Sequence, residues 1–222
     1  MAPAAVTRLA VFAYGSLVAP ASAALTLGRP VELAGPATLR GWARGWTVCR
    51  DNLTSEKTFA RADGSLPRFC LGLGVEPVAG ATASAGAPGA GPAGAPAAGD
   101  VPAPNGALIE VAEAELERLG VRELRYHQVE VTDAVAVAPS AGRGVAFDRV
   151  FVYRPRREHL HPTPPADSIV VAAYARAVEG AFAALGAEHL DRFHATTAAP
   201  PVEVCEAHLV GDRIPAGNPR AW

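Results

Sequence analysis

Two short segments, far apart in the chain, hold the residues best suited to chemistry. The first, Tyr14–Leu17, reads Tyr-Gly-Ser-Leu and directly follows the apolar run Leu9–Ala13. A strand that breaks at once into a Gly-Ser turn exposes consecutive backbone N–H groups, which can hold a carboxylate without a basic side chain. The second, Val121–Tyr126, contains Glu123, and an inward-turned carboxyl group can carry protons near neutral pH. Together the segments predict an anion-binding turn that faces a catalytic carboxylate.

Each segment also has an ordinary explanation. A Gly-Ser turn after a strand is usually only a turn, and this one has neither the GxxxxGKS/T pattern nor the spaced glycines of GxGxxG. Glu123 lies between Arg122 and Arg125, so it could form a simple surface salt bridge. In an extended register, however, Glu123 would share the buried face of Val121 and Val129.

Three further patterns could indicate a nucleophile, a metal site or a base-stacking surface. Ser16 could be a nucleophile, but no G-x-S-x-G elbow surrounds it and no histidine is marked as its partner. His159 and His161 could ligate a metal as a pair, but no third ligand is indicated, and a solvated loop is the simpler interpretation. Trp42 and Trp46 favour core packing over a base-stacking platform, because basic residues do not alternate with further aromatics there. We therefore expect no metal site from these patterns.

Composition excludes several classes of protein. The chain has 222 residues, of which 50% are hydrophobic and 19% charged, which suits one globular domain with a real core. The net charge of -2 and the lack of a basic stripe argue against nucleic-acid binding. Because no run approaches about 18 apolar residues, we expect no membrane-spanning helix.

The cysteines and the N-terminus bear on the cellular compartment. Cys49, Cys70 and Cys205 are widely spaced and odd in number, so neither a zinc ribbon nor a disulfide framework is indicated. The N-terminus lacks the long apolar region of a signal peptide. We expect a cytoplasmic protein.

Apolar runs, periodicity and breakers predict the secondary structure. Strands are expected at Leu9–Ala13, within Ala37–Arg50, at Phe69–Val75, at Gly106–Val111, around Val129–Val135 and at Val145–Tyr153. Helices are expected at Ala19–Leu27, at Ala112–Leu119 with Gly120 ending it, from a cap at Asp167 or Ser168 to Leu185, and at Ala187–His194.

One segment interrupts this pattern. Residues 79–104 are almost wholly Ala, Gly and Pro, so they cannot bury enough side chain to offset their ordering entropy. We interpret them as a flexible loop inserted into one domain that spans residues 1–222, because strand-like sequence resumes at once. A linker between two domains is the alternative. The region at about 166–194 is then a C-terminal helical extension.

The sequence resembles the gamma-glutamylcyclotransferase-like superfamily, which includes the AIG2-like and ChaC-like proteins. The resemblance covers about residues 8–153, and its motifs are Phe12–Leu17 and the strand–helix–acid series from Gly106 to Tyr126. It implies a mixed α/β (α+β) fold, a small β-barrel with flanking helices. It also implies that Glu123 is the general acid/base. The implied substrate-binding residues are Phe12, Ala13, Tyr14, Gly15, Ser16, Leu17 and Tyr126.

The resemblance implies a specific reaction. The α-amine of a small γ-glutamyl substrate attacks its own γ-carbonyl, which yields 5-oxoproline and a free amine or amino acid, and no metal or cofactor is needed. Two other functions stay open. The same fold could be a non-catalytic module that binds a small carboxylate or an amino-acid derivative, or a hydrolase that uses the same carboxylate.

Overall fold

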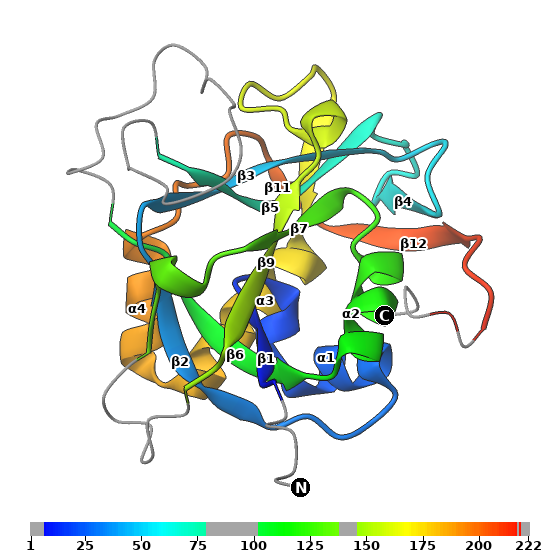
Figure 1. The fold of residues 1–222 in the computed structure, drawn as a ribbon. Coiled ribbons are helices and arrows are strands. Elements are labelled where there is room, and N and C mark those ends of the chain that lie inside the picture. The colour runs from blue at the N-terminus through cyan, green and yellow to red at the C-terminus, as the bar shows by residue number, and fades with distance from the viewer. Residues whose placement is uncertain (1–6, 79–101, 138–145, 217, 219–222) are drawn as a thin grey trace, which may run out of the picture.

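The computed structural model describes residues 7–78, 102–137, 146–216 and 218, and it forms a mixed α/β fold (Figure 1). The predicted loop at 79–104 therefore lies almost entirely outside the described residues. The strands are β1 (Leu9–Ala13), β2 (Leu33–Leu39), β3 (Trp42–Asp51), β4 (Lys57–Arg61), β5 (Phe69–Pro77), β6 (Asn105–Val111), β7 (Tyr126–Glu130), β8 (Val135–Val137), β9 (Arg149–Pro155), β10 (Ser168–Val171), β11 (Val204–Cys205) and β12 (Ala207–Asp212). The α-helices are α1 (Pro20–Leu27), α2 (Glu113–Arg122), α3 (Ala172–Leu185) and α4 (Ala187–Ala195).

The largest sheet has the strand order β7-β9-β1-β6-β2-β8, and it curls in Figure 1. Strand β1 lies near its middle, antiparallel to β6 and parallel to β9. All five residues of β1 are buried, which explains why its sequence is a continuous apolar run and not an alternating one. The turn that follows β1 therefore starts from a rigid, central strand.

A second sheet has the order β11-β10-β5-β3, and β12 pairs with β4 in a two-stranded ribbon. In Figure 1 helices α1 and α2 lie together on one side of the large sheet, and α4 lies on the other side. Helix α1 begins with Pro20 at its first turn and ends at Gly28, whose φ of 72° is the left-handed conformation that glycine adopts easily.

Most predicted elements are confirmed, but the end of helix α2 is not where the sequence placed it. The helix continues through Gly120 to Arg122, and Glu123 is its C-terminal cap residue. The prediction that Gly120 ends the helix is wrong, and so is the extended register of Glu123. A mid-helix glycine costs only about 1 kcal/mol, and the four hydrogen bonds that Arg122 donates to α1 and Ser16 favour the extra turn.

The long helix also differs from its prediction. Ser168–Val171 is strand β10, which pairs in parallel with β5, and helix α3 begins only at Ala172. The β-branched run Ile-Val-Val suits a buried strand better than a helix start. Asp167 is no helix cap either, because its carboxylate pairs with Arg61 at 2.7 Å and accepts the backbone N–H of Arg68 at 2.8 Å.

Candidate active site

A cavity of about 550 Å³ lies between strands β1, β3 and β5 and helices α1, α2 and α3. Every residue predicted for the site lines it: Phe12, Ala13, Tyr14, Gly15, Ser16, Leu17, Glu123 and Tyr126. The structure thus brings together two segments that are over a hundred residues apart. The roles predicted for these residues stay predictions.

The turn after β1 offers free backbone donors to this cavity. Ser16–Val18 form one short 3-10 turn, closed by the hydrogen bond from the Val18 N–H to the Gly15 carbonyl at 3.0 Å. Among the described residues, none accepts a hydrogen bond from the backbone N–H of Gly15, Ser16 or Leu17. A methyl group on Gly15 would make ordinary van der Waals contacts, 3.6 Å from the Tyr174 hydroxyl and 3.8 Å from the Leu73 side chain. Such a turn can receive an anion.

Glu123 is held at the end of α2 by its backbone. Its N–H donates to the Leu119 carbonyl at 2.8 Å, and its own carbonyl accepts the Tyr126 N–H at 2.9 Å. The side chain is only 16% exposed, and its Oε1 lies 3.3 Å from Nε of Arg122. Burial raises the pKa of Glu123, and the Arg122 charge opposes that rise only in part.

All four tyrosines of the chain surround this carboxyl group. Each of them lines the cavity, and the charge of Glu123 helps to raise the pKa of each: Tyr14, Tyr126, Tyr153 and Tyr174. Burial is the larger cause, and it raises the pKa of Tyr174 to about 12. The Tyr14 hydroxyl donates to the Tyr153 carbonyl at 2.6 Å, and the Tyr126 hydroxyl donates to the Leu73 carbonyl at 2.8 Å. The phenols are therefore neutral, and these hydrogen bonds hold two of them in place.

Arg122 connects Glu123 to the turn. Its side chain is 5% exposed. The guanidinium donates to the Ser22 carbonyl at 2.8 Å, to the Thr26 hydroxyl at 2.7 Å and to the Ser16 hydroxyl at 3.2 Å. A cation thus lies between the Glu123 carboxyl group and the Ser16 hydroxyl of the turn. The ion pair of Glu123 with Arg122 is largely buried, so it is not the simple surface salt bridge that the sequence left open.

Arg44 holds the same turn from the other side. It is 4% exposed and has no carboxylate partner among the described residues. It donates to the Tyr14 carbonyl at 3.2 Å, to the Asn105 side-chain oxygen at 2.9 Å and to the Thr196 hydroxyl at 2.9 Å. Its guanidinium also lies over the Phe193 ring at 4.3 Å. Burial lowers the pKa of Arg44 to about 9, which leaves the group charged at neutral pH.

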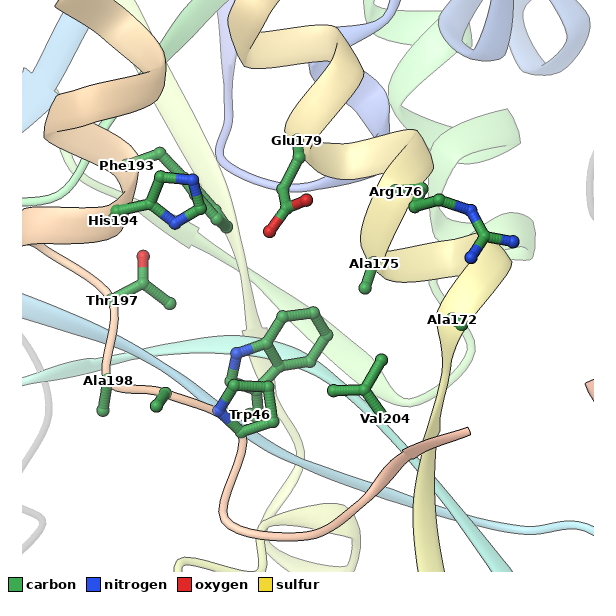
Figure 2. Close-up of a pocket in the computed structure, with 12 residues that line it drawn as sticks. Trp46, Ala172, Ala175, Arg176, Glu179, Phe193, His194, Thr197, Ala198 and Val204 are labelled. Atoms are coloured by element: carbon green, nitrogen blue, oxygen red, sulfur yellow. The ribbon is translucent and has the colours of Figure 1, made fainter. Parts of the chain in front are cut away.

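A smaller second cavity, of about 220 Å³, lies beside Trp46 (Figure 2). The Trp46 ring meets Tyr174 edge-on, with ring centroids 6.0 Å apart, and Tyr174 lines the large cavity. Figure 2 shows the Glu179 carboxylate directed into this space and the Arg176 guanidinium pointing away from it. Trp46 and the partly buried Trp42 belong to the core, which confirms the packing interpretation of these tryptophans.

The other candidate sites gain no support from the structure. No histidine is among the described residues that line the large cavity, so Ser16 has no base there. His159 and His161 are half-buried, and no cluster of three or more His, Cys, Asp or Glu side chains that could hold a metal is found in the described part of the chain. The same part contains no helix that is long and apolar enough to cross a membrane.

Sequence reasoning missed Arg44, Arg122 and two of the four tyrosines, Tyr153 and Tyr174. Arg44 had one usable signal. It lies two residues before Trp46 in the predicted strand, so its side chain is on the same buried face as Trp46. Arg122 had no such signal. Its burial depends on the extra helical turn after Gly120, and the sequence predicted that the helix would end at this glycine. The tyrosines come from four different elements, so only the fold brings them together.

Comparisons with known proteins bear on the fold. No family model and no curated protein matches the chain. A solved gamma-glutamyl cyclotransferase is similar, with a TM-score of 0.52 and 14% identity over 90% of this chain and 94% of that one. YkqA from Bacillus subtilis is 16% identical over 84% of this chain and 52% of its own, with a TM-score of 0.47. The chain therefore has a gamma-glutamyl cyclotransferase-like fold, which confirms the predicted mixed α/β class.

Proposed function

We propose that this protein cyclises a γ-glutamyl amine or γ-glutamyl amino acid to 5-oxoproline, with Glu123 as general acid/base. The observation that carries the proposal is the shared cavity. It holds a poorly hydrated carboxyl group with a raised pKa on one side and a turn with free N–H groups on the other. The likeness in fold to gamma-glutamyl cyclotransferase supports the same reaction class.

The proposed reaction needs only groups of this chain and of the substrate. The backbone N–H groups of Gly15–Leu17, with the Arg122 charge behind them, hold the α-carboxylate. The α-amine attacks the γ-carbonyl carbon and forms the new C–N bond of a five-membered ring, while Glu123 takes a proton from that amine. The same proton then goes to the departing nitrogen as the old C–N bond breaks.

The raised pKa of Glu123 suits both halves of this cycle. A carboxylate with an ordinary pKa is a weak base, and its acid form is scarce at neutral pH. Burial among neutral phenols makes the protonated form more accessible, so the group can return the proton that it accepted. The large effective molarity of a reaction within one molecule supplies much of the remaining acceleration.

The first experiment is a screen of γ-glutamyl amines and peptides, with 5-oxoproline measured by mass spectrometry. For any active substrate we expect Glu123→Gln to lower kcat by about 10²–10⁴-fold, the usual contribution of general acid–base catalysis. Glu113→Gln is the matched control, because Glu113 is an exposed residue of the same helix. Full activity of Glu123→Gln would exclude the assigned role.

The alternatives give different products. A hydrolase would release glutamate instead of 5-oxoproline. A non-catalytic module would show thermal stabilisation by a small carboxylate or amino-acid derivative with no turnover of any γ-glutamyl compound.

A further inference from the structure

Besides Glu123 and Arg122, the large cavity is lined by charged residues of β3, of β4, of the segment between them and of the segment after α2. Arg50, Glu56, Lys57 and Arg125 all line it. The proposed reaction uses none of them. Their arrangement bears on what the other half of the substrate must be.

Three of these four groups are neutralised by protein. Arg125 pairs with Glu56 at 2.7 Å through two parallel hydrogen bonds, which helps to lower the pKa of Glu56 to about 2 although burial alone would raise it. Lys57 lies 3.5 Å from Asp212. Arg50 forms no ion pair with any described residue. One positive charge is therefore left over in the cavity of a protein whose net charge is negative.

Arg50 also has hydrogen-bonding capacity to spare. A guanidinium has five N–H donors. One nitrogen donates to the Lys57 carbonyl at 2.5 Å, and the guanidinium lies over the Phe59 ring at 5.2 Å. The guanidinium also lies beside the Cys70 thiol, a weak acceptor, and its charge helps to lower the pKa of Glu56. The Glu56 carboxylate is already paired with Arg125, so this half-buried, fixed cation is suited to bind a second anion from outside.

Strand β5 sets the distance from this cation to the reacting centre. Leu73 accepts the hydrogen bond of Tyr126 beside Glu123, and Cys70, three residues earlier, lies beside Arg50. Three residues of a strand cover roughly 10 Å. An extended chain of two or three residues has about the same length. Leu73 also borders the Gly15 turn, because a Cβ on Gly15 would lie 3.8 Å from its side chain. We infer from this spacing that a γ-glutamyl conjugate with a carboxylate on its leaving half can reach from the turn to Arg50.

We propose that Arg50 forms a second anion subsite, which selects γ-glutamyl substrates whose leaving amine carries its own carboxylate, an amino acid or a short peptide, over neutral amines. This inference rests on the proposed function for the identity of the γ-glutamyl half. Arg50 is a specificity residue and takes no part in the chemical step.

The test uses two substrates that differ only in charge, γ-glutamyl-alanine and γ-glutamyl-alaninamide, with the full-length protein. A charge-assisted hydrogen bond contributes about a 10- to 100-fold preference, so we expect kcat/KM to favour the carboxylate by that factor. In Arg50→Gln the preference should vanish through a higher KM for γ-glutamyl-alanine, with the amide unaffected. Arg68→Gln is the matched control, because Arg68 also lies over a phenylalanine ring but does not line the cavity.

A calorimetric binding measurement with Glu123→Gln separates the two proposals. If both substrates turn over equally and Arg50→Gln changes neither, the subsite is wrong and the proposed function stands. A second outcome is that no γ-glutamyl compound is turned over, but γ-glutamyl-alanine binds to Glu123→Gln and this binding is lost when Arg50→Gln is added. In that case the subsite is supported and the proposed enzymatic function is wrong. If neither compound is turned over or bound, both proposals are overturned. Equal losses for both substrates in Arg50→Gln would mean that Arg50 only supports the fold.

Discussion

Arg44 is the residue on which the geometry of the turn should depend most. A buried guanidinium without a carboxylate is rare, because burying a charge is costly unless polar groups replace its water. Here neutral oxygens from three segments do so: the Tyr14 carbonyl, Asn105, and the end of α4 with Phe193 and the threonines at 196 and 197. Replacing Arg44 with leucine would keep much of its volume and remove every donor.

The structure gives a magnitude for Arg44→Leu. The Tyr14 carbonyl and the Asn105 side-chain oxygen would each lose a buried donor, at about 1–3 kcal/mol apiece. Loss of the contacts with the Phe182 and Phe193 rings adds about 1 kcal/mol. Removal of the desolvated charge offsets part of this. We expect a net loss of about 3–5 kcal/mol in the free energy of unfolding.

Urea denaturation followed by tryptophan fluorescence would measure this loss. Arg40→Leu is the control, since Arg40 is exposed on the same hairpin and its side chain makes one hydrogen bond within the described residues, to the Asp133 carbonyl. It should change stability by no more than about 0.5 kcal/mol. The stability loss of Arg44→Lys should lie between those of Arg40→Leu and Arg44→Leu, because lysine keeps the charge but not the planar set of donors. A loss below 1 kcal/mol for Arg44→Leu would refute the view that this cation holds the turn in place.

Three further predictions concern the cavity. Gly15→Ala should change the free energy of unfolding by less than about 1 kcal/mol, because the added methyl meets only ordinary contacts. The same variant should bind a γ-glutamyl substrate more weakly, as measured by calorimetry. Because burial raises the pKa of Glu123, its charge destabilises the fold, so Glu123→Gln should melt higher than wild type at pH 7 and no higher at pH values below the ordinary carboxyl range. A thermal shift that is independent of pH would contradict this. The charge of Glu56 has the opposite effect on stability, because the pKa of this group is lowered to about 2. Its pairing with Arg125 contributes about 2–3 kcal/mol of stability above pH 5, and this is lost as the pH falls toward 2. Glu56→Gln should therefore be less stable than wild type at pH 7 but not in strong acid.

Local patterns sufficed for the strands and helices whose signals are strong. The apolar run before Tyr14 and the Pro20 to Gly28 frame of α1 both lie where the sequence placed them. The failures share one cause, which is that tertiary contacts overruled a local rule. Gly120 stays helical because Arg122 binds α1, and Ser168–Val171 is a strand because β5 offers it a partner.

The candidate site could be predicted only through its two motifs. The Gly-Ser turn and Glu123 are visible in one sequence, since each lies next to a recognisable element. The burial of Arg122, the position of Arg44 and the free charge of Arg50 depend on contacts between distant segments. No periodicity encodes these contacts, so a single sequence could not reveal them.

The charges around the turn also favour the proposed enzyme over a simple carboxylate-binding module. A ligand carboxylate held by the Gly15 turn would lie in the same cavity as Glu123, and two negative charges in such a site repel each other. A ligand that also carries an amine relieves this repulsion when the amine lies toward Glu123 and the carboxylate toward the turn and Arg122. An α-amino acid head group satisfies this arrangement, and a plain carboxylate does not. The same orientation places the amine where Glu123 can remove its proton, so the feature that selects the ligand is also the one that cyclisation requires.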